Sequence, residues 1–162
     1  QIEIKTEYGF DEITGIPKLK FKDKDVCAIT DVEKTFDQVT GKEDPTGKMF
    51  RVYNAAFARF PDSDGLEYWI KQNSSGANSD RQVAESFLAS EEFTRKYGEN
   101  VSTAEYVNNL YKNILGRDAD QEGLNYWIGQ LDNGIESRSE ALLGFAESAE
   151  NKAIFSEVTG LI

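Results

Sequence analysis

Apolar side chains from about residue 45 onward recur every three or four positions, the spacing of one face of an α-helix. The first stripe consists of Met49, Phe50, Tyr53, Ala56, Phe57 and Phe60. Asp44 and Pro45 precede it, and this pair suits an N-cap followed by the first helical position. A second stripe consists of Tyr106, Val107, Leu110, Tyr111, Ile114 and Leu115. Each stripe predicts an amphipathic helix.

Three further segments carry the signature of a capping box, in which a Ser and a Glu or Gln three residues later satisfy each other's backbone N–H. The pairs are Ser79 with Gln82, Ser102 with Glu105, and Ser137 with Glu140. Each pair predicts the start of a helix.

The first forty residues have a different pattern. Residues 2–8 and 19–22 alternate apolar and charged side chains around a Gly/Pro turn at 15–17. Alternation with period two predicts strands, so we expect a β-hairpin or small β-ribbon packed on the helices. The polar segment 35–47 is interpreted as a linker.

The strongest signal is an internal repeat. The stretch Arg59–Ile70 aligns without gaps with Arg117–Ile128, 58 residues later, and the two share Arg, Asp, Gly-Leu and Tyr-Trp-Ile at the same places. The alignment extends both ways, and Glu92 matches Glu150. We therefore predict a mainly α fold with two tandem modules of three to four helices after the N-terminal ribbon. The expected segments are 1–40 for the ribbon and linker, 44–100 for the first repeat and 101–162 for the second.

Composition narrows the function classes. The 162 residues carry a net charge of -11, which disfavours nucleic acid and anionic membrane surfaces. No apolar run approaches the roughly 20 residues of a membrane-spanning helix, so no membrane insertion is expected. Because histidine is absent, His-based catalysis and imidazole–zinc sites are excluded, and any metal needs oxygen ligands. The lone Cys27 is expected to be a buried structural thiol. A chain that starts at Gln1 is expected to be a mature product or a piece of a longer protein.

The acidic residues before the repeated glycine allow two interpretations. Asp62 and Asp64, with their counterparts Asp120 and Glu122, offer hard oxygen ligands for Ca²⁺, although the spacing is not that of an EF-hand. The same residues can instead cap and complement a helix N-terminus, which we favour. No other cofactor is expected.

The repeated aromatic and basic residues also allow a structural and a binding interpretation. The pairs Tyr68-Trp69 and Tyr126-Trp127 could form a platform for sugars or peptides, but the indoles are expected in equivalent buried positions. Arg59 and Arg117 are expected to hold the adjacent acidic loop through a charge-assisted hydrogen bond, with a ligand role as the alternative.

The repeated pattern Tyr-x5-Arg-x2-Asp-x2-Gly-Leu-x-Tyr-Trp, followed by a Gly and a Phe-x2-Ser-x-Glu ending, resembles the DUF4214 family. In style it is similar to the helical linker domain of phycobilisomes. The second copy departs with Asn151 in place of Phe93 and with Asp118-Ala119 in place of Phe60-Pro61. The whole chain resembles the C-terminal region of marine cyanobacterial proteins exported by type I secretion, without their calcium-binding repeats. This resemblance implies an extracellular or cell-surface location and no assigned activity.

We therefore expect a non-catalytic assembly or attachment module of a secreted bacterial protein. Its partners would be further copies of itself, another surface protein or an extracellular glycan. The alternative is a glycan- or peptide-binding module that targets a larger secreted enzyme.

Overall fold

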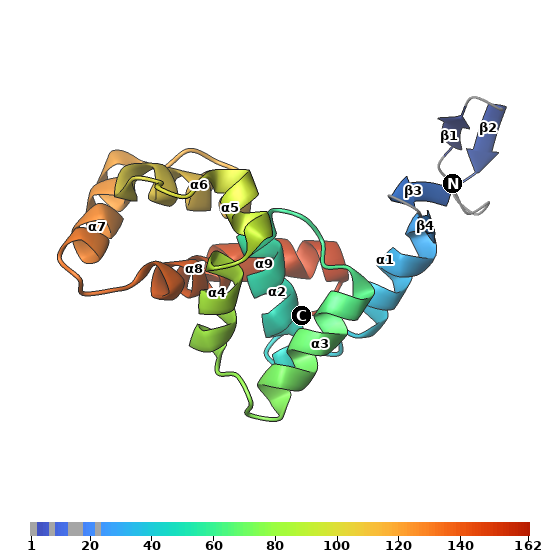
Figure 1. Cartoon of the computed structure of the whole chain (residues 1–162), viewed down its shortest axis with the longest axis horizontal. Helices are drawn as coiled ribbons and strands as arrows, with labels where there is room; N and C mark the ends of the chain where they lie inside the picture. The colour runs from blue at the N-terminus through green and yellow to red at the C-terminus, as the bar shows by residue number, and fades with distance from the viewer. Residues whose placement is uncertain (1–2, 7–8, 13–17, 22–23) are drawn as a thin grey trace.

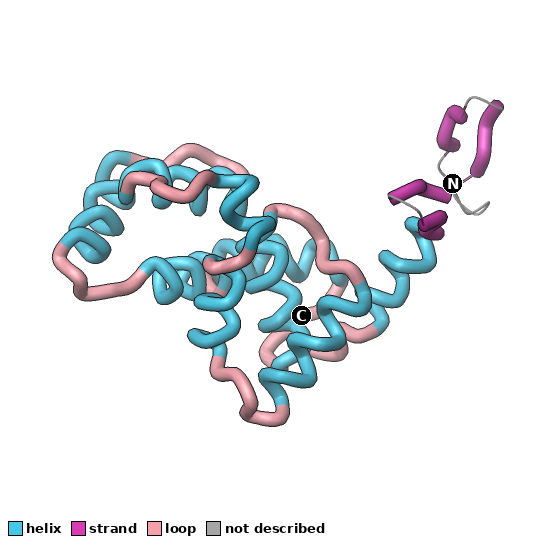
Figure 2. Tube along the Cα trace, viewed as in Figure 1, coloured by secondary structure: helices cyan, strands magenta, loops and turns pink. Residues whose placement is uncertain are grey.

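The computed structural model describes residues 3–6, 9–12, 18–21 and 24–162, with side chains from Thr30 onward. These residues are mainly helical, as predicted (Figure 1, Figure 2). In chain order the helices are α1 (Ala28–Asp37), α2 (Pro45–Phe57), α3 (Ser63–Ser74), α4 (Asp80–Leu88), α5 (Glu91–Tyr97), α6 (Thr103–Leu115), α7 (Gln121–Asp132), α8 (Arg138–Ala146) and α9 (Ala149–Thr159).

Four short strands precede the helices: β1 (Glu3–Thr6), β2 (Gly9–Glu12), β3 (Lys18–Phe21) and β4 (Lys24–Cys27). The strands form two antiparallel pairs, β1 with β2 and β3 with β4. The prediction placed one hairpin turn at 15–17, whereas each described strand pairs with its immediate neighbour in the chain. The pairs lie beyond α1 and away from the other helices (Figure 1). The side chain of Cys27 and the turn at 15–17 lie outside what the structure describes.

Helix α1 occupies part of the segment that was predicted to be a linker. This helix packs against α2 and against the loop between α2 and α3. The Thr35 hydroxyl is fully buried and donates to the Pro61 carbonyl at 2.9 Å. The Phe36 ring lies 5.3 Å from the rings of both Phe50 and Phe60. Residues 35–37 therefore belong to a packed helix, and only 38–44 connect it to α2.

The helices follow the sequence repeat. Helices α2 to α5 start at Pro45, Ser63, Asp80 and Glu91, and α6 to α9 start 58 positions later at Thr103, Gln121, Arg138 and Ala149. All three predicted capping boxes are present, and Asp44 caps α2 with Pro45 in its first turn. Local capping chemistry thus sets where these helices begin.

Helix α2 ends earlier than the apolar stripe indicated. Its last residue is Phe57, and Ala58 takes a left-handed conformation with φ of 49°. Phe60 therefore lies beyond the helix, 45% exposed, and packs on Phe36 and Phe50 rather than continuing the stripe. The corresponding residue in the second repeat is Gly116, also left-handed with φ of 67°.

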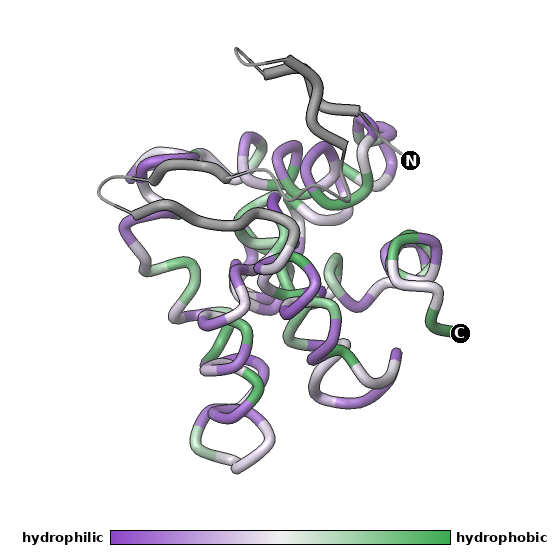
Figure 3. The backbone as a smooth tube through the Cα atoms, turned by 90° about the vertical axis from the view of Figure 1, so that its right-hand side faces the viewer, coloured by the Kyte–Doolittle hydropathy of each residue, from purple (hydrophilic) through white to green (hydrophobic). Residues whose placement is uncertain are grey.

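One continuous hydrophobic core includes residues from both repeats. It contains buried residues of α2 and α4 together with those of α6, α8 and α9, and α4 packs against α8. Figure 3 shows apolar and polar residues alternating along the helices that enclose this core. Within the described residues, no helix is long and apolar enough to cross a membrane.

An ion pair between a buried arginine and a partly exposed glutamate also joins the two repeats. The Arg51 side chain on α2 is 1% exposed and forms a two-point contact with the Glu147 carboxylate at the end of α8, with Nη2 to Oε1 at 3.1 Å. Arg51 also donates to the Lys42 carbonyl and lies 4.7 Å above the Phe155 ring. The equivalent positions are Asn109 and Ala89, so this contact occurs on one side of the interface only.

Candidate functional site

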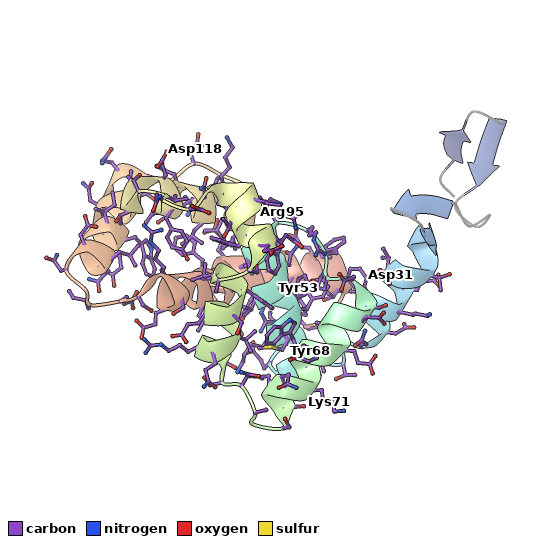
Figure 4. All side chains as sticks on the ribbon, viewed as in Figure 1. Asp31, Tyr53, Tyr68, Lys71, Arg95 and Asp118 are labelled. Carbon is purple, nitrogen blue, oxygen red and sulfur yellow. The ribbon has the colours of Figure 1, made fainter. Side chains whose placement is uncertain are left out.

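Each repeat contains a cluster of Tyr, Arg and Glu that joins three of its segments. In the first repeat Arg59 donates from Nε and Nη2 to the two oxygens of Glu92, at 3.0 and 2.8 Å. Its Nη2 also donates to the Tyr53 hydroxyl at 3.2 Å, and the guanidinium lies 5.2 Å from the Tyr53 ring centre. The cluster ties the end of α2 to the start of α5, and Figure 4 shows Tyr53 inside the helical body.

The second repeat reproduces the arginine–glutamate ion pair and the contact of the arginine with the tyrosine ring. Arg117 donates from Nε and Nη2 to Glu150 at 2.8 and 3.1 Å, and its guanidinium lies 5.1 Å from the Tyr111 ring centre. Asp118, which follows Arg117, lies at the outer rim of the molecule (Figure 4). The ion pair connects α6 with the start of α9.

The main partner of each arginine differs from the predicted one. Asp62 and Asp120 lie 3.8 Å from Arg59 and Arg117, whereas the glutamates make the short two-point contacts. Glu92 and Glu150 were not predicted as site residues. Their match across the repeat was the available signal, but only the fold shows that they meet the arginines from 33 positions away.

The two ion pairs shift the pKa values of their carboxylates. The hydrogen bond from Arg59 lowers the pKa of Glu92, and that from Arg117 lowers the pKa of Glu150, because each stabilises the charged form. Burial raises the pKa of the Tyr53 and Tyr111 hydroxyls, so both stay protonated near neutral pH. The clusters are therefore charge-paired at neutral pH.

The four acidic residues considered for calcium occupy helix starts. Asp62 and Asp120 are N-caps whose side chains accept from the Gly65 and Gly123 N–H at 2.9 and 2.7 Å. Asp64 and Glu122 lie in the first turns of α3 and α7. In the part of the chain that the structure describes, no three Asp, Glu or Cys side chains are grouped to hold a metal ion.

The glycines of the motif have a steric reason. A Cβ at Gly65 would lie 2.3 Å from the Asp62 Oδ1, and a Cβ at Gly123 would lie 2.3 Å from the Tyr111 hydroxyl oxygen. Real Cβ atoms do not approach that closely. The first turn of α3 is therefore packed closely against its N-cap Asp62, and the first turn of α7 against the Tyr111 hydroxyl.

The Tyr-Trp pairs occupy equivalent positions with different exposures. Trp69 and Trp127 were expected in equivalent buried positions; both are half-buried and pack against the core, with ring centres 5.0 and 5.1 Å from those of Phe87 and Phe145. Tyr68 and Tyr126 are 54% and 57% exposed, each edge-on to the neighbouring indole. Each repeat therefore combines an indole anchored on the core with a tyrosine at the surface.

The Phe60-Pro61 difference between the repeats has a structural explanation. In the first repeat these residues receive α1, through the Phe36 ring and the Thr35 hydroxyl. Asp31 of α1 also accepts from the Ser63 hydroxyl at 2.7 Å. The second repeat has Asp118 and Ala119 at the equivalent positions. The first repeat is therefore specialised to dock the N-terminal helix.

A cavity of about 170 Å³ lies in the second repeat next to its ion pair. It is lined by Tyr111, Leu115, Arg117, Trp127, Gly144, Phe145, Ser148 and Glu150. Sequence reasoning named Arg117 and Trp127 but missed Gly144, whose role depends on the helix opposite.

Residues 84–155 match the sequence model of a family described as "Domain of unknown function (DUF4214)". The matched stretch begins in α4 and ends in α9, so it crosses the expected boundary at residue 101. No curated protein and no solved structure matches the chain.

Proposed function

We propose that the chain is a non-catalytic attachment module of an extracellular or cell-surface protein, and that it assembles with further copies of itself. One observation carries this proposal: Tyr68 and Tyr126 are exposed at equivalent positions, while the adjacent arginines and glutamates are paired inside their own repeats. Tyrosine is enriched at protein interfaces because its rigid ring offers a large contact area. Two equivalent contacts on one packed body gain strength by avidity.

The proposal includes the tandem origin of the two repeats. We infer that residues 44–100 and 101–162 are two copies of one DUF4214-type module, similar in style to phycobilisome linkers. The 58-residue spacing of helix starts and the paired Tyr–Arg–Glu clusters support this origin. Export by type I secretion from a cyanobacterium, which the resemblance to such proteins implies, is part of the same proposal.

The second candidate function is a glycan- or peptide-binding module that targets a larger secreted enzyme. The cavity beside Trp127 and the Arg117–Glu150 pair favours it, because ligand sites combine apolar walls with a few placed polar groups.

Size-exclusion chromatography with light scattering tests self-assembly. We expect the mass of the wild type to rise with protein concentration, and the Tyr68→Ala, Tyr126→Ala double variant to stay monomeric, because both contacts are lost. Lys71→Ala, an exposed change on the same helix as Tyr68, is the matched control and should behave as wild type (Figure 4). A wild-type monomer at every concentration would contradict self-assembly.

The same experiment with calcium tests the acidic residues. Extracellular calcium modules bind at about 10⁻⁴–10⁻³ M, so about 5 mM Ca²⁺ suffices. Because Asp62 and Asp120 already cap helices, we expect no change in mass. Calcium-dependent assembly that is lost on changing Asp64 and Glu122 to amides would establish the metal site instead.

A further inference from the structure

Two residues that line the cavity of the second repeat are smaller than their counterparts in the first repeat. Leu115 replaces Phe57, and Gly144 replaces Ser86. In the first repeat the Phe57 ring lies 5.1 Å from Tyr53 and 5.0 Å from Phe87, with the Arg59 guanidinium 5.8 Å above it. A phenyl ring therefore fills the space between the arginine and the core there. Leucine carries no such ring.

Gly144 also controls the position of the indole. A Cβ at residue 144 would lie 3.2 Å from Cη2 and 3.8 Å from Cζ2 of Trp127, so the six-membered ring of the indole lies across this position. The Trp127 plane is tilted 44° to Phe145, whereas Trp69 is 87° to Phe87. The indole of the second repeat thus leans over a backbone without a side chain and forms one wall of the cavity.

The lining combines aromatic walls with a neutral polar edge. Tyr111, Trp127 and Phe145 supply rings, and Arg117 and Glu150 compensate each other's charge. Arg117 donates to Glu150 from Nε and Nη2 and to the Asp118 carbonyl from Nη1. Guanidinium N–H groups and carboxylate lone pairs remain for a ligand, because arginine has five donors and each carboxylate oxygen accepts more than one. A charged ligand would find no uncompensated partner.

The cavity opens to solvent, and its volume is sufficient for one ring of a ligand. A cavity on the order of 150 Å³ accepts a benzene-sized molecule, and this one has about 170 Å³. The ligand therefore needs an apolar face for the indole and hydroxyl groups at its edge for the ion pair. We propose that this cavity binds a single pyranose ring of a neutral carbohydrate, with Trp127 under the ring and Arg117 and Glu150 bonded to its hydroxyls. This inference rests on the second candidate function and gives it a ligand class and a site.

Tryptophan fluorescence provides a direct readout, because the chain contains two tryptophans and Trp69→Phe leaves Trp127 alone. The probes are the methyl glycosides of glucose, galactose and mannose, and N-acetylglucosamine, each titrated to about 50 mM because one ring binds with a Kd on the order of 1 mM. We expect a saturable change with at least one sugar. Gly144→Ser, which restores the residue of the first repeat, should weaken binding at least tenfold. Ser86→Gly in the first repeat is the matched control and should leave the affinity unchanged.

Two outcomes would overturn the proposal: no saturable change with any sugar, or an equal change in the Gly144→Ser variant. Tighter binding of tetramethylammonium than of every sugar would also overturn it, in favour of a cation site. If Gly144→Ser does not fold, the amide chemical shifts of the wild-type protein locate the binding site instead. On addition of the sugar, the shifts of residues 144–150 should change. Because these readouts monitor the second repeat's cavity, their failure leaves self-assembly through Tyr68 and Tyr126 untouched.

Discussion

At position 58 the backbone ends α2 in a left-handed conformation with a residue that is poorly suited to it. Ala58 has φ of 49°, and its counterpart Gly116 has φ of 67°. A Cβ in this region crowds the following carbonyl, which costs roughly 1–2 kcal/mol, and glycine avoids that cost. The repeated glycines are also explained by one close contact each. Gly65 lies too close to Asp62, and Gly123 too close to the Tyr111 hydroxyl, to carry a Cβ.

Replacing Ala58 by glycine should raise the free energy of unfolding by about 1 kcal/mol, less than the full relief because glycine also gains freedom in the unfolded chain. Urea denaturation followed by circular dichroism measures the change. The reciprocal Gly116→Ala change should lower stability by a similar amount. A loss of stability in the Ala58→Gly variant would show that the contacts of the alanine methyl group contribute more to stability than the relief of backbone strain.

At the scale of elements, the two ion pairs hold the last helix of each repeat. Arg59 bonds Glu92 at the start of α5, and Arg117 bonds Glu150 at the start of α9. The capping boxes that start α4, α6 and α8 were predictable, because each lies within four consecutive residues. The glutamate partners of the two arginines were not predictable, because they lie 33 positions away in the chain. They come into contact with the arginines only after the intervening helices have packed.

The Glu92 pair should make stability depend on pH in acid. Its pKa is lowered in the folded protein by the Arg59 hydrogen bond, so the stabilisation is complete above the unfolded pKa of about 4.5 and is lost as pH falls through the lower folded value. The side chains are more than a third exposed, so the effect is less than about 1 kcal/mol. Glu92→Gln should therefore lower the melting temperature at pH 7, and its difference from wild type should shrink below about pH 4.5.

Thermal melts at several pH values check this expectation. Glu91→Gln, a neighbouring change on the same helix, should leave the melting temperature at pH 7 near that of wild type, because Glu91 makes no ion pair in the described part of the chain. If the difference in melting temperature between wild type and Glu92→Gln stays constant from pH 7 to 3, the ion pair is not its source.

At the scale of the whole molecule, the two repeats share one core. Residues of α2, α4, α6, α8 and α9 pack together, and Arg51 of the first repeat is buried against Glu147 of the second. The family match at 84–155 crosses the boundary between the repeats, in keeping with helices that pack across it. The shared core places the helices of Tyr68 and Tyr126 on one packed body, and the proposed avidity requires that both contacts can form at once.

Removing the buried partner of this pair should be costly. Arg51→Ala leaves the partly exposed Glu147 carboxylate without its two-point partner and should lower the free energy of unfolding by about 2–3 kcal/mol. Arg81→Ala is the control: it removes an exposed pair with Glu140 that also crosses the repeats, and should cost less than about 1 kcal/mol. Urea denaturation measures both, and a shared core predicts a single transition. Two separate transitions in the wild type would mean that the repeats unfold independently.

Sequence alone determined the features whose physics is local. The helical class, the starts of α2, α4, α6 and α8, and the equivalence of the Tyr-Trp pairs follow from caps, periodicity and a 58-residue repeat. Only the tertiary structure decided the rest. The docking of α1 on Phe60-Pro61, the glutamate partners of the arginines and the cavity lined by Gly144 each depend on residues far apart in the chain. Such contacts are set by how several helices pack at once, and no short stretch of sequence encodes them.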